Sequence, residues 1–423
     1  MRKIAVSQFN KNVFTLFSGT LVAQVIPIAI SPLLSRLYSP ADFGVFTYFT
    51  AISSILTTIV TGRYEIAVLL PKEQKTALEV VMVAFYVSCG VSIISALFFL
   101  LFGGIISREL GSHKPYVWLY LVFLVAFMMG LYKVFFNWFN RVEAYKMLSI
   151  NRVYRSILLS VSQVAFGLTP YIRQSGLIFG QFIAEIFATT ALGWKIFKNE
   201  QKNLTEIDVA SIKAQALRYI GYPKYSMPAD LINVATNQIP IFLFAAYFGN
   251  QVVGLYGFAI RILGVPVSLI ASSILDVFKQ KASSDFVNTG SCRAIFLRTL
   301  KNLVLLSIVP FTILAIISPY AFAIVFGAQW KASGEYIQIL CLLFFVRFVA
   351  SPLSYVLYIA EKQKVDLLWQ IALFATTMLS MAIGIRMQSF EVCLWSFSIS
   401  YSIMYIIYIY LSYVYSGPKQ LLV

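Results

Sequence analysis

Long runs of apolar residues, separated by short polar segments, recur along the whole chain of 423 residues. A helix rises about 1.5 Å per residue, so roughly 20 apolar residues cross the ~30 Å hydrocarbon core of a bilayer. The pattern therefore predicts an all-α membrane protein of about twelve transmembrane helices, with no soluble domain between them. The first run is too long for a cleaved signal peptide. The expected spans are 13–34, 43–70, 77–104, 116–137, 154–172, 176–197, 224–247, 254–278, 300–326, 335–360, 367–386 and 391–415.

Composition supports a chain that lies in the membrane throughout. Hydrophobic residues make up 59% of the sequence and charged residues only 12%, about half the charged fraction of a soluble domain. The net charge of +16 lies mostly in short loops between apolar runs, which argues against nucleic acid as a partner. The four cysteines show no CxxC spacing and His113 is the only histidine. We therefore expect no metal site, no cofactor and no histidine-based catalytic triad.

The distribution of basic residues predicts the orientation of the chain in the membrane. With a cytoplasmic N-terminus, 23 of the 33 Lys and Arg residues fall in cytoplasmic segments and six in outside loops. Basic loops stay on the cytoplasmic side during insertion. The chain is thus expected to be a multi-pass protein of a cytoplasmic membrane, with both termini inside.

The chain divides into two similar halves. The longest loop, 198–223, is polar and separates an expected six-helix lobe, 1–197, from a second one, 224–423. Residues 38–46 (YSPADFGVF) resemble residues 248–256 (FGNQVVGLY) at an offset of 210 positions. Each is a short turn that leads into the start of an even-numbered helix. Parallel six-helix repeats are a common plan for transporters.

Charged residues within the apolar runs are the candidate functional residues. A charge at the bilayer centre costs at least about 2.5 kcal/mol, so such residues usually face a cavity or a partner. Arg261, Arg347, Arg63 and Lys133 are expected to form a cationic path for an anionic cargo, because guanidinium groups bind phosphate through two hydrogen bonds. The alternative is that some of them reach the interface or form buried ion pairs.

A second set of polar residues lies on the seventh expected helix. Asp230, Asn233 and Asn237 are spaced i, i+3 and i+7, and so share one helical face. This stripe would line the transport path or join neighbouring helices. Glu185 and Asp230 are candidates for coupling to H⁺ or Na⁺, and pairing with a nearby arginine is the alternative role.

Two segments resemble polysaccharide-biosynthesis flippases. Residues 33–46 (LLSRLYSPADFGVF) are similar to the end of helix 1 and the start of helix 2 in Wzx-type proteins of the multidrug/oligosaccharidyl-lipid/polysaccharide (MOP) exporter superfamily. Residues 253–266 (VGLYGFAIRILGVP), continuing to 278–283 (FKQKAS), are similar to helix 8 of that family. The resemblance implies two six-helix lobes around a central cavity. It also implies a cationic lumen, which Arg261 matches by its place in the motif.

The resemblance implies the translocation of undecaprenyl-diphosphate-linked oligosaccharide, such as an O-antigen repeat unit, across a bacterial inner membrane by alternating access. The chain would be a transporter rather than an enzyme, with the polymerase and chain-length proteins of the same pathway as candidate partners. No GxxxxGK[ST] loop for ATP is found, so an ion gradient or the membrane potential would drive transport. The alternatives are an ion-coupled drug or cation exporter of the same superfamily and, less favoured by the short outside loops, a membrane polysaccharide polymerase.

Overall fold

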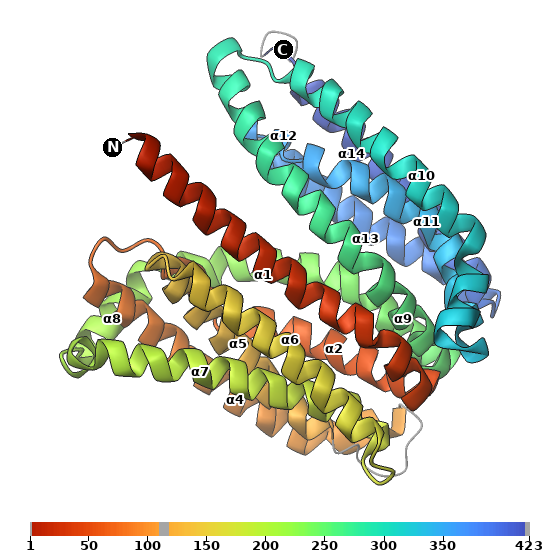
Figure 1. Ribbon diagram of the computed structural model, residues 1–423, viewed down its shortest axis with the longest axis horizontal. Helices are drawn as coiled ribbons and strands as arrows, with labels where there is room; N and C mark the ends of the chain where they lie inside the picture. The colour runs from red at the N-terminus through yellow and green to blue at the C-terminus, as the bar shows by residue number, and fades with distance from the viewer. Residues whose placement is uncertain (1, 110–117, 419–423) are drawn as a thin grey trace. The chain divides into compact units, whose positions relative to one another are not determined.

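The computed structural model describes residues 2–109 and 118–418 of the chain, with side chains described for 15–105, 118–264, 267 and 269–418. His113 lies outside the described residues. The described residues are helical nearly throughout (Figure 1). The elements of the first half are α1 (Arg2–Leu37), α2 (Pro40–Val60), α3 (Tyr64–Ala67), α4 (Gln74–Glu109), α5 (Leu119–Arg141), α6 (Tyr145–Gly167), η1 (Arg173–Ser175), α7 (Gly176–Thr205), α8 (Val209–Arg218) and η2 (Tyr222–Ser226). They are followed by α9 (Met227–Thr289), α10 (Arg293–Phe326), η3 (Ala328–Trp330), α11 (Lys331–Leu353), α12 (Val356–Ile359), α13 (Gln363–Arg386) and α14 (Phe390–Tyr415).

These helices confirm the all-α membrane fold. Ten described helical segments are long and apolar enough to cross a bilayer. Helix α9 contains two of the expected spans. They are separated at Gly249, where the backbone leaves the helical conformation with φ 83° and ψ 169°. Such a positive φ suits glycine, because it has no Cβ to clash with the neighbouring backbone. With α6 and the two parts of α9 counted separately, each of the twelve expected spans has a helix.

Three local predictions were wrong. The span 335–360 is not one helix, because α11 ends at Leu353 and α12 begins at Val356. The span 43–70 is not one helix, because α2 ends at Val60 and the chain turns through Gly62 and Arg63, which both have positive φ, before α3 begins. The expected loop 198–223 is largely helical: α7 continues to Thr205, and Asp208 caps α8 by accepting a hydrogen bond from the Ser211 amide at 3.0 Å. An N-cap aspartate satisfies an amide that the first helical turn leaves unpaired.

The described structure separates into two compact units, Met1–Gly254 and Leu255–Val423. The first unit holds α1 to α8 and the beginning of α9. Its core includes Leu78, Trp138, Leu148 and Leu192, which come from α4, α5, α6 and α7. The predicted lobe boundaries at 197 and 224 remain a prediction.

The second unit holds the rest of α9 and α10 to α14. Its aromatic centre joins three elements: the Phe258 ring lies 4.2 Å from Trp330 and 5.0 Å from Phe326, centroid to centroid. Phe258 and Trp330 are both fully buried. The phenylalanine of the family-like segment 253–266 therefore packs the unit's core.

Local signals explain the start of α2. Ser39 is its N-cap, Pro40 takes the first helical position, and Asp42 accepts a hydrogen bond from the Ser39 amide at 2.9 Å while Ser39 Oγ accepts one from the Asp42 amide at 3.2 Å. This reciprocal capping box fixes the direction in which the chain enters the helix. Tyr38, just before it, donates its hydroxyl to the Gln163 carbonyl at 2.6 Å and so ties the turn to α6.

The two similar turns of the sequence meet at a backbone crossing within the first unit. A Cβ built on Gly44 would lie 1.9 Å from the Asn250 carbonyl oxygen, and one built on Gly254 would lie 1.7 Å from the Pro40 carbonyl oxygen. Gly44 corresponds to Gly254, and Pro40 to Asn250, at the offset of 210 seen in the sequence. The glycines therefore allow α2 and α9 to approach backbone to backbone.

Candidate functional site

The arginine expected in the second span lies at the break between α2 and α3. Arg63 has a φ of 64°, in the left-handed region that costs a non-glycine residue about 1 kcal/mol or more. The backbone groups that the break frees from helical bonding are partly recovered by α5. Asn137 donates its side-chain amide to the Glu65 carbonyl at 2.9 Å, and Arg141 donates to the Leu69 carbonyl at 3.3 Å. Broken membrane helices need such partners because lipid supplies none.

Arg63 pairs with two carboxylates of its own unit through its terminal nitrogens. Its Nη1 lies 3.2 Å from Glu65 Oε1, and its Nη2 lies 2.6 Å from Asp230 Oδ2. Lys133, on α5, interacts electrostatically with both of these carboxylates. The four side chains carry two positive and two negative charges. The cluster is thus electrically balanced, and it joins α3, α5 and α9.

Glu185, the other carboxylate expected to couple to an ion, also forms an ion pair with an arginine. Glu185 on α7 is buried and pairs with Arg155 on α6, whose guanidinium lies 4.6 Å from the centre of the Tyr132 ring. Next to it, Arg152 donates to Thr20 on α1 and lies 4.4 Å from the centre of the Phe136 ring. These contacts place two arginines between α1, α5, α6 and α7, where each has a partner.

The polar stripe of α9 is divided by these contacts. Asp230 turns to Arg63, whereas Asn233 and Asn237 are exposed on the surface of the unit. Asn237 donates its side-chain amide to the Asn233 carbonyl of its own helix at 2.8 Å. The two asparagines are accessible, and their role in transport remains a prediction.

Arg347 in the second unit has a different environment. It lies on α11 within the candidate span Ala328–Ile359 and is partly buried. The titratable groups that interact with it are three tyrosines: Tyr256 on α9 and Tyr401 and Tyr405 on α14. No carboxylate of the described residues forms an ion pair with Arg347. These phenols are neutral, so their presence near the guanidinium does not cancel its charge.

Arg261 is the second uncompensated cation of this unit. It lies twelve residues beyond the Gly249 break in α9, about 18 Å along the helix. Within the described residues it forms no ion pair and no hydrogen bond, and it is partly buried. Leaving a guanidinium without a partner in a membrane helix is costly unless water or an anion reaches it. Arg261 and Arg347 therefore give the second unit two cations available to an anion.

Sequence reasoning missed the tyrosines around Arg347 and the arginine partner of Glu185. Tyr256, Tyr401 and Tyr405 look like ordinary apolar-run residues, although 401 and 405 are one helical turn apart and so share a face. Arg155 was counted with the cytoplasmic segment before the fifth span, because the expected helix began at 154 and the actual helix begins at Tyr145.

Residues 33–335, well over half of the chain, match the protein family described as "Polysaccharide biosynthesis protein". The chain belongs to this polysaccharide biosynthesis family. The match covers both segments on which the sequence resemblance rested. A comparison with curated proteins gives no match.

Solved structures with the same fold come from the MOP superfamily. The lipid II flippase MurJ in an inward closed conformation matches with a TM-score of 0.74 and 13% identity, over 94% of this chain and 87% of that one. An inward-facing multidrug resistance MATE family transporter matches with a TM-score of 0.68 and 12% identity, over 95% and 93% of the two chains. A MOP superfamily transporter from Pyrococcus furiosus matches with a TM-score of 0.61 and 12% identity, over 96% and 94%. This member of the polysaccharide biosynthesis family is therefore a multi-pass membrane protein with the MOP transporter fold.

Proposed function

We propose that this protein is a flippase for a lipid-linked oligosaccharide, and that Arg261 and Arg347 bind the diphosphate of the cargo. The observation that carries the proposal is the contrast between the two units. In the first unit Arg63, Arg152 and Arg155 each bond to a neighbouring side chain. In the second, Arg261 and Arg347 form no ion pair with any described residue.

The chemistry of this pair suits a phosphate-bearing cargo. Arginine keeps its charge in apolar surroundings and presents a planar fork of donors that matches phosphate oxygens. The hydroxyls of Tyr256, Tyr401 and Tyr405 would add donors beside Arg347. A cationic drug would be repelled by two uncompensated arginines, which favours the flippase over the drug-exporter alternative.

The finer parts of the proposal follow from the family and the sequence. The cargo would be an undecaprenyl-diphosphate-linked repeat unit, of O antigen or a related surface polysaccharide, moved by alternating access across the inner membrane of a bacterium. Both termini would be cytoplasmic, as the distribution of basic residues indicates. Family membership in polysaccharide biosynthesis supports this cargo, and MurJ is an example of a flippase with the same fold.

We also propose that Arg63 and Lys133 take part in binding the anionic cargo, on one condition that concerns their carboxylate partners. The Glu65 and Asp230 carboxylates now neutralise them, so they could bind an anion only after one carboxylate takes up a proton or a cation. Asp230 would then couple ion binding to cargo binding in the first unit. Glu185 would do so through Arg155.

The test is translocation in reconstituted vesicles. A fluorescent polyprenyl-diphosphate oligosaccharide is incorporated, and the fraction that becomes accessible to an impermeant quencher is followed with time. Arg347→Ala and Arg261→Ala should each lower the rate at least about tenfold, because a charge-assisted hydrogen bond contributes about 1.5–3 kcal/mol. Lys331→Ala is the matched control: Lys331 is an exposed residue of the same unit that pairs with Glu335 at 3.7 Å.

Two results would contradict the proposal. One is a normal translocation rate in the Arg261→Ala, Arg347→Ala double variant at equal protein content. The other is no movement of the diphosphate cargo by the unaltered protein together with export of a cationic dye, which would support the drug-exporter alternative.

A further inference from the structure

A groove lies between α9 and α10 in the second unit, with a cavity volume of about 400 Å³. Lys281, Arg298 and Asn302 line it at one end, and Val277, Phe278 and Leu306 line it further along. All of these residues belong to the same compact unit. We refer to it as the α9–α10 groove.

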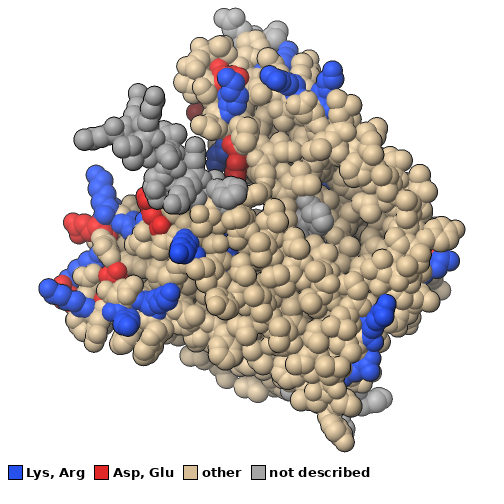
Figure 2. All heavy atoms as spheres, in the orientation of Figure 1, with Lys and Arg blue, Asp and Glu red and all other residues tan. Residues whose placement is uncertain are grey.

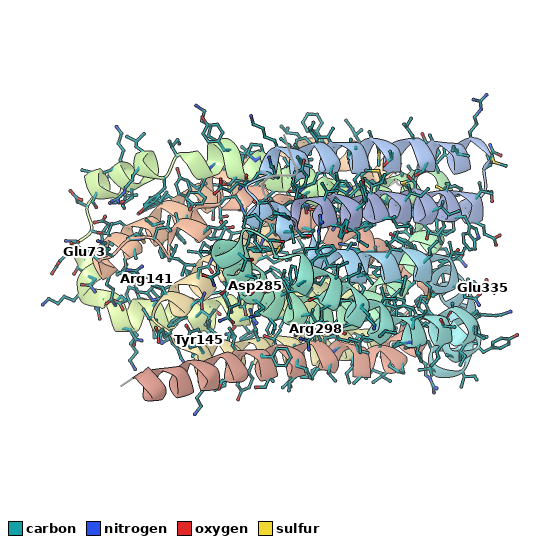
Figure 3. The ribbon with its side chains drawn as sticks, turned by 90° about the horizontal axis from the view of Figure 1, so that it is seen from above. Glu73, Arg141, Tyr145, Asp285, Arg298 and Glu335 are labelled. Carbon is teal, nitrogen blue, oxygen red and sulfur yellow. The ribbon has the colours of Figure 1, made fainter. Side chains whose placement is uncertain are left out.

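The cationic and the apolar side chains of the groove lie at different positions along the two helices. On α10, Arg298 lies near the beginning of the helix, and Leu306 lies two turns further on, about 12 Å along the axis. On α9, Lys281 comes one turn after Val277, toward the end of the helix. Both helices therefore place a cation at the end where they are connected and apolar side chains deeper in the membrane. Figure 3 shows Arg298 and Asp285 in this part of the unit, with Glu335 at its opposite end.

The charge of the groove is positive and only partly balanced. None of its lining residues is acidic. Lys281 Nζ lies 3.3 Å from Asp285 Oδ1, whereas Arg298 is exposed and forms no ion pair with any residue that the structure describes. In Figure 2, Lys and Arg spheres gather over this end of the unit with some Asp and Glu spheres among them, whereas its middle is almost free of charge. The groove therefore offers one free guanidinium, with Lys281 beside it.

The apolar part of the groove is open to the surroundings of the helices. Val277 is 71% exposed and Leu306 is 53% exposed, although both lie within expected membrane spans, 254–278 and 300–326. In a bilayer such side chains contact acyl chains. Asn302, one turn after Arg298 on α10, supplies an amide between the cationic and the apolar parts.

We propose that the α9–α10 groove binds an anionic glycerophospholipid, with its phosphate on Arg298 and Lys281 and an acyl chain along Val277, Phe278 and Leu306. Basic pockets between membrane helices recognise lipid headgroups in this way. A phosphodiester carries one negative charge, which the unpaired Arg298 matches, whereas a diphosphate cargo carries at least two. The site is separate from Arg261 and Arg347 and does not depend on the proposed function.

The test measures lipid retention and not transport. Purified protein is equilibrated with mixed micelles of phosphatidylglycerol and phosphatidylcholine, and bound lipids are counted by native mass spectrometry. The unaltered protein should retain phosphatidylglycerol in preference to phosphatidylcholine. Arg298→Ala should lower this preference about tenfold, and Arg298→Lys should restore part of it, since a lysine keeps the charge but loses the two-pronged contact.

Lys301→Ala is the matched control. Lys301 lies on α10 one residue before Asn302 and does not line the groove, and its replacement removes the same charge from the same end of the helix. The preference should survive this change. Three results would overturn the proposal: equal retention of the two phospholipids, equal loss in Arg298→Ala and Lys301→Ala, or displacement of phosphatidylglycerol by an equimolar polyprenyl diphosphate. The last would make the groove a cargo site.

Discussion

Replacing Gly254 with leucine is expected to prevent accumulation of folded protein. A Cβ at this position would lie 1.7 Å from the Pro40 carbonyl oxygen and 2.7 Å from the Gly44 amide nitrogen. Both are backbone atoms at the start of α2, so no side-chain rotation can relieve the overlap. The two helices would have to separate, which would expose the packed surface around them. Gly44→Leu should have the same effect, because its Cβ would lie 1.9 Å from the Asn250 carbonyl oxygen.

The measurement is the amount of monodisperse protein extracted from membranes, by fluorescence-detected size-exclusion chromatography. Gly90→Leu is the control. Gly90 lies within α4, and a Cβ there meets no atom within 4 Å. A Gly254→Leu variant that is extracted as well as Gly90→Leu and keeps its unfolding temperature would contradict the close approach of α2 and α9.

Glu185→Ala should destabilise the first unit by at most about 3–5 kcal/mol, the range observed when one partner of a fully buried ion pair is removed, because the Arg155 side chain is 31% exposed. The Glu185 side chain is 3% exposed, and its loss would leave the Arg155 guanidinium in the membrane beside the Tyr132 ring with no anion. The double variant Glu185→Ala, Arg155→Met should recover much of the loss, because it leaves no unpaired charge. Reversible unfolding in mixed detergent micelles would give the free energies for the cycle.

An exposed pair supplies the comparison. Lys75 and Glu206 lie 3.5 Å apart with side chains 43% and 51% exposed, so Glu206→Ala should change the unfolding free energy by no more than about 1 kcal/mol. If Glu185→Ala cost no more than Glu206→Ala, the Arg155–Glu185 pair would have to be accessible to water, and it would no longer count as a structural link between α6 and α7.

Much of the fold could be predicted because the hydrocarbon core of the bilayer imposes the same requirement on every segment that crosses it. A membrane helix needs a long apolar run, and most of the expected runs correspond to helices without an internal break. One exception, 43–70, shows the limit of this reasoning. Thr61, Gly62 and Arg63 interrupt the apolar run only briefly, and beyond the break the carbonyls of Glu65 and Leu69 accept hydrogen bonds from Asn137 and Arg141 of another helix. A pattern along one segment cannot report a partner from a distant one.

The candidate site was harder to predict from the sequence, because its partners also come from distant segments. Intramembrane charges can be found by inspection, but whether a charge is balanced depends on packing. Arg63 and Arg347 look alike in the sequence, yet one has two carboxylates and the other has three tyrosines. Asp230 and Glu185 were expected either to bind an ion or to pair with arginine, and both lie beside an arginine. Their part in ion coupling stays a prediction.

The paired contacts at Gly44 and Gly254 have the form of a homodimer interface. Position 40 of the first repeat faces position 254 of the second, and position 44 faces position 250, so the same two sites touch each other twice in reciprocal fashion. A contact of this kind is isologous, as between two identical subunits related by a two-fold axis. A chain of half this length could make the same crossing with a second copy of itself. The crossing of α2 and α9 thus has the local symmetry of such a contact, and the halves, expressed as separate polypeptides, should assemble through these glycines.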